Sequence, residues 1–381
     1  MARRVSGAAG LDRIDRWLSP SLEASTAMPT EVDRMPVQSF AALGEVWRAL
    51  EAGAPHSFFQ SWTWVGCLAE ERYPDPVLLQ ATRDGRIVGL ALFNRRSGRL
   101  HLGETGEAER DRPFTEHNGP LATDPEAAAA LLRAAMAAGG AGLVLGGVPP
   151  SLVEATGGVV VRLQRRDAPF VDLDAVRAAG SDPLARLSAN ARYQLRRSHR
   201  FYKGDWDRLE VDRAGSVAEL DAWFEELARL HEATWSRRGR PGAFATPYLR
   251  RFHRALMGQA LARDELDLLR VSGPGGAVGF LYNVRHLRVV YAYQSGLADP
   301  TGQPHAKPGL TCHALAIELA AGRGDLRYDL LAGDQRYKRS LADRSVPLVW
   351  AELASPFSIR AFAGCLRALA GRLRGGGGVV G

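Results

Sequence analysis

The sequence predicts an α+β protein of two lobes, each a mixed, mostly antiparallel sheet flanked by helices. The chain has 381 residues, which is long for one hydrophobic core and suits two domains. The same order of predicted elements occurs twice along it: two helices, three strands, one helix and a further strand. The strands come in hairpins, which differs from the regular strand–helix alternation of a doubly wound parallel sheet.

Composition favours a globular protein that binds an anion. Hydrophobic residues make up 46% and charged residues 24%, without the apolar run of about 18 residues that a membrane span needs. The first twenty residues lack the apolar stretch of a secretory signal, so we expect a cytoplasmic protein. The net charge of +7 favours a nucleotide, a phosphorylated sugar, RNA or an anionic membrane surface. An arginine-rich composition without functional meaning is the alternative.

The cysteines predict neither disulfides nor a metal site. Cys67, Cys312 and Cys365 lie far apart in the sequence. Neither a disulfide framework nor a Cys-x-x-Cys metal pair can be built from them. We therefore expect no metal in the protein.

The first lobe is predicted over residues 37–170, after a flexible N-terminal arm over 1–36. The arm has no sustained periodicity apart from one short helix near 11–18. The hydrophobic periodicity of the lobe predicts helices at 39–53 and 61–71, three strands within 76–104, a helix at 125–138 and a strand at 142–148. Asp84-Gly85 and Ser97-Gly98 are pairs that tight hairpin turns favour.

The second lobe is predicted over residues 171–355, and a basic helix within 182–205 precedes its other elements. An amphipathic helix and a glycine-rich tail follow over 356–381. The pattern of the lobe predicts helices at 216–239, 246–262 and 309–322, three strands within 266–297, and strands at 326–333 and 346–353. The run GPGGAVG at 273–279 precedes a strand instead of a helix, so it is interpreted as a hairpin turn and not as a dinucleotide motif.

The basic helix places arginines in one row. Arg192, Arg196 and Arg200 are spaced i, i+4 and i+8, so they share a face. Three interpretations remain open: phosphate binding in a donor or acceptor, an RNA contact, or a solvated face. Aromatic residues are few here, which weakens the case for stacking on single-stranded RNA.

Four stretches of the second half resemble a known family. They are LSANARYQLRRSHR, LHEATWSRRGRPGAF, YAYQSG and KPGLTCHALAIELAAGRGDLRYDLLAGDQRYK. In order and spacing they resemble the CelD/BioF2-like acyltransferase branch of the GNAT superfamily, which is related to the FemAB peptidoglycan aminoacyltransferases. The resemblance covers roughly residues 38–352 and is most specific in the second half.

The resemblance implies tandem GNAT-like lobes, with catalysis in the second lobe and an acceptor cleft shaped by the first. It implies transfer of an acyl group from acyl-CoA to a small-molecule acceptor such as a sugar, an amino acid or a lipid precursor, in polysaccharide or cell-envelope biosynthesis. An aminoacyl-tRNA-dependent transferase and a non-catalytic GNAT-fold binding module are the alternatives. DNA is not an expected partner.

Donor binding is predicted where the strand ending at 297 meets the helix that begins at 309. Backbone N–H groups at such a helix start form an anion site, which in GNAT enzymes holds the pantetheine-pyrophosphate arm of acyl-CoA. The family's multi-glycine loop is missing from this sequence, and a simple helix start is the alternative. The predicted donor-binding residues are Gln294, Ser295, Gly296, Lys307, Pro308 and Gly309, together with Arg192 and Arg196.

Catalytic residues are predicted after the strand at 326–333. Asp334 is the preferred general base for the acceptor, and Tyr337 is the candidate acid for the leaving group. Lys338 would stabilise the oxyanion or hold a phosphate, and an aromatic–lysine pair contacts the donor in the FemAB relatives. Tyr293 is a further catalytic candidate. In the alternative, Asp334 caps the next helix and Lys338 is solvated.

The acceptor is expected near the end of the helix at 216–239. His231 and Trp235 are spaced i, i+4 and so face one way, and Arg238 follows them. With Tyr291 they are the predicted acceptor-binding residues; a core position for the pair is the alternative. The amphipathic helix after 356 would either contact an anionic membrane or pack on the second lobe.

Overall fold

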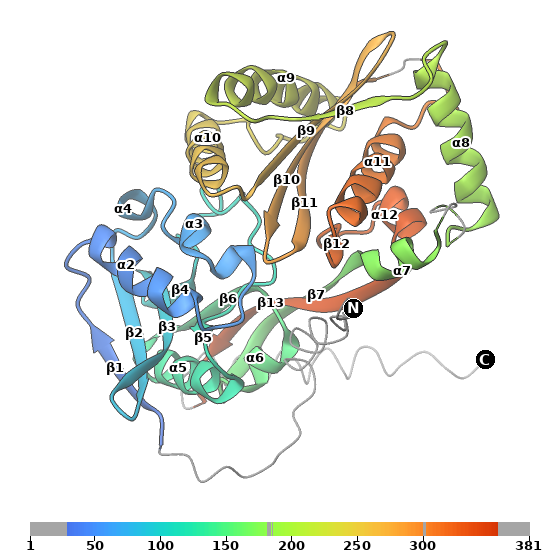
Figure 1. The fold of residues 1–381 in the computed structure, drawn as a ribbon. Coiled ribbons are helices and arrows are strands. Elements are labelled where there is room, and N and C mark those ends of the chain that lie inside the picture. The colour runs from blue at the N-terminus through green and yellow to red at the C-terminus, as the bar shows by residue number, and fades with distance from the viewer. Residues whose placement is uncertain (1–28, 181–183, 185, 300–301, 357–381) are drawn as a thin grey trace, which may run out of the picture. The chain divides into compact units, whose positions relative to one another are not determined.

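The computed structural model describes residues 29–180, 184, 186–299 and 302–356. In these residues the chain forms two compact units, 29–165 with 348–356, and 166–347 (Figure 1). Both boundaries lie within strands, β7 (Val159–Asp172) and β13 (Arg344–Ala354). The last strand therefore contributes to the first unit, because β13 pairs with β6 from Val349 to Leu353. The sequence had assigned this strand to the second lobe.

The first unit is built on one mixed sheet whose order is β1-β2-β3-β4-β6-β13, with β5 paired to β3. Only the β4–β6 pair is parallel. The other strands of this unit are β1 (Glu31–Met35), β2 (Pro76–Arg83), β3 (Arg86–Arg96), β4 (Arg99–Leu102), β5 (Leu121–Ala122) and β6 (Gly142–Val148). Its helices are α2 (Phe40–Glu51), the 3₁₀ turn η1 (Phe58–Gln60), α3 (Trp62–Val65), α4 (Ala69–Arg72), α5 (Pro125–Ala138) and α6 (Pro150–Glu154).

The two hairpin turns predicted for the first unit are confirmed. Asp84-Gly85 and Ser97-Gly98 both adopt positive φ at both positions, as the favoured hairpin turn requires. The flexible arm was predicted too long, because residues 31–35 form β1. This segment has no strong pattern of its own and is held by pairing with β2. The predicted short helix near 11–18 lies outside the described residues.

The helix predicted at 61–71 is also corrected. It consists of two short helices, α3 and α4, on either side of Leu68, whose φ of 48° is left-handed and ends a right-handed helix.

The second unit repeats the arrangement with the sheet order β7-β12-β11-β10-β9-β8, in which only β11 and β12 are parallel. Figure 1 shows α9 and α10 on one face of this sheet and α8, α11 and α12 on the other. The strands are β8 (Glu210–Arg213), β9 (Leu266–Gly273), β10 (Gly276–His286), β11 (Val289–Leu297) and β12 (Arg327–Asp329). The helices are α7 (Leu173–Ala178), α8 (Ala189–Lys203), α9 (Val217–Ser236), α10 (Pro247–Ala262), α11 (Pro308–Gly322) and α12 (Arg336–Leu341).

The predicted fold class is confirmed. Each unit has three antiparallel strands, then a helix that packs into the hydrophobic core, then a strand parallel to the third one. In the first unit that helix is α5, and in the second it is α11. The strand predicted at 326–333 is shorter than expected, because the chain leaves the sheet after Asp329 and takes a left-handed φ at Leu331.

Of the helices in the described ranges, none combines the length and apolarity needed to cross a membrane.

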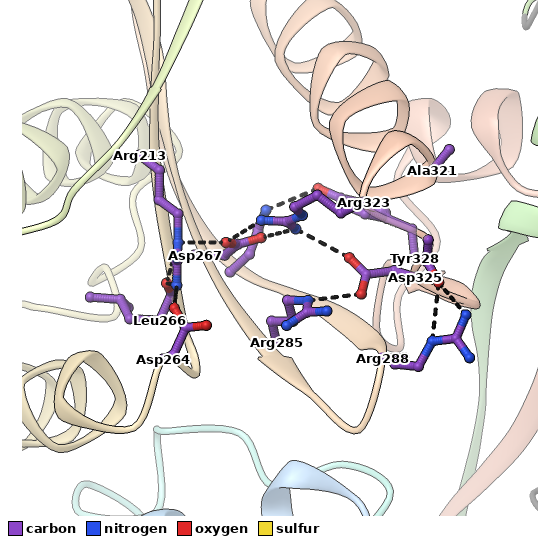
Figure 2. Close-up of polar contacts among 12 residues, drawn as sticks. Arg213, Asp264, Leu266, Asp267, Arg285, Arg288, Ala321, Arg323, Asp325 and Tyr328 are labelled. Carbon is purple, nitrogen blue, oxygen red and sulfur yellow. Dashed lines mark hydrogen bonds and ion pairs between the residues drawn. The ribbon is translucent and has the colours of Figure 1, made fainter.

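A buried ion network fixes the C-terminal end of α11 to the sheet (Figure 2). Asp267 on β9 is 1% exposed and accepts hydrogen bonds from Arg323 Nη1 at 2.8 Å, with Arg213 Nε at 3.0 Å. Asp325, fully buried, accepts from Arg285 Nε at 2.8 Å and from Arg323 Nη2 at 3.3 Å. Two carboxylates are thus neutralised by three arginines that come from β8, β10 and the end of α11.

Removing one carboxylate from this network is expected to destabilise the protein strongly. Asp267→Ala removes the buried carboxylate that two guanidinium groups share, and breaking a buried ion pair costs about 3–5 kcal/mol. Asp212→Ala is the matched control, because Asp212 also accepts from an arginine, Arg270 at 2.8 Å, but its side chain is 43% exposed. That loss should be about 0–1 kcal/mol. Urea unfolding measures both, and equal losses would show that the network does not hold α11.

Candidate functional site

The strand β11 extends beyond its pairing with the parallel strand β12. Pairing with β12 runs only from Val289 to Tyr291, although β11 continues to Leu297. The predicted donor residues Gln294, Ser295 and Gly296 lie on this end, which pairs with β10 but not with β12, at the carboxyl side of the strand, where α/β folds place ligands. A Cβ on Gly296 would lie 2.3 Å from the carbonyl oxygen of Leu227 in α9, so this glycine is needed for the helix to pack closely.

The N-terminus of α11 has no side-chain cap. Lys307 is the N-cap residue and its side chain accepts nothing; Pro308 at the first helical position has no N–H. Within the part of the chain that the structure describes, the N–H groups of Gly309 and Leu310 donate to no protein acceptor. Open N–H groups at the positive end of a 15-residue helix attract an anion.

The corresponding helix of the first unit, α5, carries its own anion. Its N-cap Asp124 accepts from the N–H of Ala127 at 2.9 Å and pairs with Arg83 Nη1 at 2.9 Å. Glu126, in the first turn, also pairs with Arg83. The two units therefore share one plan but differ at the helix start: α5 is closed by carboxylates, and α11 begins with a lysine and no acid.

The arginine helix α8 supports the open end of α11. The Oγ of Ser198, which is fully buried, accepts the N–H of Lys307 at 2.9 Å and lies 2.7 Å from Oγ1 of Thr311. Arg192 and Arg196 lie on the outward part of the same helix, lining a hollow of about 380 Å³. Sequence reasoning missed Ser198, whose signal is a small polar residue in the apolar row that starts with Ala191 and Leu195.

Tyr337 on α12 lies flat against a histidine of α11. Its ring stacks on His313 with centroids 4.9 Å apart and planes 6° apart. Asn283 Nδ2 donates to the Tyr328 hydroxyl, which in turn lies 2.9 Å from His313 Nδ1. Since this hydroxyl accepts from Asn283, its proton is available to a neutral His313.

Burial sets the protonation of this stack. It lowers the pKa of His313 to about 3, with a smaller contribution from the charge of Lys338. Burial also raises the pKa of Tyr337 to about 12. Both side chains are therefore neutral near pH 7, and Tyr337 keeps its phenolic proton.

Lys338 and Asp334 occupy different environments. Lys338 is 5% exposed, and its Nζ donates to the carbonyl oxygens of Leu331 and Ala332, both at 3.0 Å. Asp334 is exposed and pairs with Arg339 at 2.7 Å. The N-cap of α12 is Gln335. The alternative of a capping Asp334 and a solvated Lys338 is therefore wrong, while their predicted catalytic roles stay predictions.

Tyr291 and Tyr293 are buried on one face of β11. The Tyr293 ring lies 5.4 Å from Tyr282 and 5.8 Å from His253, centroid to centroid. His253 is fully buried, and its ring nitrogens form no hydrogen bond with the described residues. Burial lowers the pKa of His253 to about 3, with a smaller contribution from the charge of His231.

The predicted acceptor residues of α9 are brought together. His231 Nε2 lies 3.0 Å from the N–H of Ala243 and accepts from it, so Nδ1 carries the proton and donates to the Ser295 carbonyl oxygen at 2.8 Å. Trp235 lies beside His231, with ring centroids 5.8 Å apart, and the Arg238 guanidinium lies 5.4 Å from the Trp235 ring. His231 thus fixes the end of β11; an acceptor role for the three residues stays a prediction.

No three His, Cys, Asp or Glu residues in the described ranges are arranged to hold a metal ion.

The buried neutral histidines predict a loss of stability in acid. The unfolded chain protonates His253 near pH 6.5, whereas the folded protein does so near pH 3, so stability falls as the pH drops between these values. His253→Leu should remove this contribution and reduce the stability lost between pH 7.5 and 5 by about 2 kcal/mol. Urea unfolding at the two pH values tests this, and an unchanged pH dependence would contradict it.

Comparison with known proteins supports the resemblance that the sequence of the second unit indicated. Residues 189–339 match the model of the Acetyltransferase (GNAT) domain family. A search of the curated proteins found no match.

Three solved structures resemble most of the chain in fold. The C-terminal domain of a putative lysylphosphatidylglycerol synthetase from Agrobacterium fabrum is 14% identical over 90% of this chain and 100% of its own, with a TM-score of 0.53. FemX is 10% identical over 84% of this chain and 96% of its own, with a TM-score of 0.55. L-PGS from Bacillus licheniformis is 11% identical over 85% and 96%, with a TM-score of 0.50. At these identities the likeness is one of fold. The family match adds that residues 189–339 are similar to the GNAT acetyltransferase domain, as the resemblance predicted.

Proposed function

We propose that the protein is an acyltransferase whose second unit binds acyl-CoA at the start of α11. The acceptor would be an amine or hydroxyl of a sugar, amino acid or lipid precursor, in polysaccharide or envelope biosynthesis. The observation that carries the proposal is the uncapped, acid-free start of α11 beside the end of β11 that β12 leaves unpaired. A pyrophosphate is the kind of group that such a helix end accepts.

The reaction forms one bond and breaks one. The acceptor nitrogen or oxygen attacks the thioester carbonyl carbon, the carbon–sulfur bond breaks, and the sulfur leaves as a thiolate. The acceptor must lose one proton and the sulfur must gain one. Asp334, whose carboxylate is exposed, is the proposed group for the acceptor proton.

Tyr337 would act at the leaving sulfur. With a pKa of about 12 it is a weaker acid than a thiol, whose pKa is near 8.5, so complete proton transfer from it is uphill. Its role is therefore to donate a hydrogen bond to the developing thiolate. The stacked His313 ring keeps the Tyr337 ring in place. The thiolate is protonated after the carbon–sulfur bond has broken.

A carboxylate cap at the start of α11, like the one on α5, should weaken donor binding. Lys307→Asp would place a carboxylate cap at the helix start and repel a pyrophosphate, whereas Lys307→Asn provides a neutral cap of the same shape. We expect the Asp variant to bind acetyl-CoA at least about 10-fold more weakly than the Asn variant, with no loss of thermal stability. Calorimetric titration with acetyl-CoA, longer acyl-CoAs and free CoA measures this.

Equal affinities in the two variants would place the donor elsewhere. If the unmodified protein binds no CoA species at all, the acyl-CoA proposal fails. An aminoacyl-tRNA-dependent transferase and a non-catalytic binding module then take its place.

Tyr337→Phe isolates the hydroxyl from the stack. Phenylalanine preserves the ring on His313 and removes only the donor, so kcat should fall about 10²-fold while KM for acyl-CoA changes little. The assay is release of CoA thiol with the best acceptor from a screen of amino sugars, amino acids and amino lipids. Full activity in this variant would remove Tyr337 from the chemistry.

A further inference from the structure

The histidines on α9, α10 and α11 are buried, and they differ in what their ring nitrogens bind. His231 uses both nitrogens, accepting from the N–H of Ala243 and donating to the carbonyl oxygen of Ser295. Both nitrogens of His253 are enclosed without a hydrogen bond to the described residues. His313 bonds through Nδ1, whereas its Nε2 has no hydrogen bond within the described part of the chain and is not one of the enclosed atoms. Of these three histidines, His313 alone keeps a nitrogen for a ligand.

A chain of buried hydrogen bonds decides which nitrogen of His313 carries the proton. Asn283 Nδ2 donates to the Tyr328 hydroxyl at 3.3 Å, so the proton of that hydroxyl is directed to His313 Nδ1 at 2.9 Å. A neutral imidazole that accepts at Nδ1 carries its proton on Nε2. The exposed fractions of Asn283, Tyr328 and His313 are 1%, 0% and 3%, so water has little access to these bonds. Nε2 of His313 is therefore a hydrogen-bond donor.

Burial keeps the imidazole of His313 neutral. It lowers the pKa of this histidine to about 3, with a smaller contribution from the positive charge of Lys338. The Lys338 ammonium donates to the carbonyl oxygens of Leu331 and Ala332. A histidine with so low a pKa is a poor base, but a neutral imidazole is a suitable donor to a carbonyl group. Nε2–H therefore offers a hydrogen bond without giving up its proton.

His313 lies beside the group that is proposed to act on the leaving sulfur. Its ring and that of Tyr337 are stacked, with centroids 4.9 Å apart and planes 6° apart. In a thioester the sulfur and the carbonyl oxygen are bonded to the same carbon atom. A donor whose sulfur meets the Tyr337 hydroxyl therefore brings its carbonyl oxygen close to the neighbouring ring. His313 also lies about 7.5 Å along α11 from Pro308, so the helix start and this ring can contact different parts of one donor molecule.

The carbonyl oxygen is the atom on which negative charge develops during acyl transfer. When the acceptor attacks, an electron pair of the C=O bond moves to the oxygen, and it re-forms that bond when the carbon–sulfur bond breaks. A fixed donor directed at this oxygen stabilises the charge, and one such donor contributes about 10²–10³-fold in rate. His313 keeps its Nε2 proton throughout, so the proton balance of the reaction is unchanged.

We propose that His313 is a catalytic residue whose Nε2–H donates a hydrogen bond to the carbonyl oxygen of the acyl donor. Tyr328 is a positioning residue, because its hydroxyl fixes the tautomer that makes this bond possible. The inference rests on the proposed acyl transfer and adds to it the group that stabilises the oxyanion, a role that the sequence suggested for Lys338. The donor is accordingly a thioester or a related ester, whose carbonyl oxygen and leaving atom can each accept a hydrogen bond from a neutral group.

Infrared spectroscopy of bound acetyl-CoA, isotope-labelled at the thioester carbonyl and without acceptor, tests the hydrogen bond directly. In the unmodified protein the carbonyl band should lie at lower frequency than that of free acetyl-CoA, because a hydrogen bond weakens the C=O bond. His313→Phe keeps a ring stacked on Tyr337 and removes the donor, so the band should return to the free value. His253→Phe is the matched control, since it makes the same exchange at another buried histidine and should leave the shift unchanged.

Kinetics and NMR separate the donor from the ring. His313→Phe should lower kcat for release of CoA thiol about 10²-fold and change KM for acyl-CoA little. His313→Gln supplies a neutral N–H from its amide and should keep kcat within about 10-fold of the unmodified protein. Tyr328→Phe removes the bond at Nδ1. Nitrogen NMR of the labelled imidazole should then show both tautomers of His313, whereas the unmodified protein shows Nε2–H alone near neutral pH.

The inference and the proposed function can fail separately. A carbonyl band that is unshifted, or equally shifted in His313→Phe, with acetyl-CoA bound to both proteins would overturn the inference and leave the proposed function standing. An Nδ1–H tautomer or a protonated imidazole in the unmodified protein near neutral pH would have the same meaning. Calorimetry that shows no binding of any CoA species overturns both. Thermal unfolding shows which variants keep the fold; if His313→Phe does not, the carbonyl band and tautomer in the unmodified protein and in Tyr328→Phe decide.

Discussion

Two buried carboxylates, Asp267 and Asp325, are the constraint on which the second unit depends. A charge removed from water is costly unless it is paired and hydrogen-bonded, so both aspartates require their arginines. Because those arginines come from β8, β10 and the end of α11, satisfying the carboxylates fixes the helix against three strands. The helix is thereby held at its C-terminal end, and its N-terminal end is placed beside β11 without any cap of its own.

The helices α5 and α11 follow one plan but begin differently. Both helices pack in the core of their unit and come between two parallel neighbouring strands, β4 and β6 for α5 and β11 and β12 for α11. Asp124 completes α5 internally, whereas Lys307 leaves the N–H groups of α11 to be satisfied from outside. The two helix starts therefore differ in charge and in capping: carboxylates close the start of α5, and the N–H groups at the start of α11 remain open.

Features decided locally could be predicted from the sequence, and features decided by distant partners could not. Asp84-Gly85 fixes its turn through backbone preferences of the two residues, so the hairpin was predictable. The strand β1 exists because β2 offers it a partner, and no local pattern marks it. In the candidate site, the sequence predicted Gln294 near the end of a strand, Lys307 just before a helix and Tyr337 after the next strand. The bond from Ser198 to Lys307 and that from His231 to Ser295 join residues far apart in the chain.

The position of β13 has a consequence for the order in which the protein can form. Leu143 of β6 pairs with Leu353 of β13, so the sheet of the first unit is incomplete until almost the whole described chain has left the ribosome. The second unit, by contrast, is contiguous between the two boundary strands. Closing a loop that long carries a large entropy cost unless its ends are first brought together. Folding of the second unit, which lies between them in the sequence, brings these ends together. We therefore expect the second unit to fold before β13 completes the sheet of the first unit.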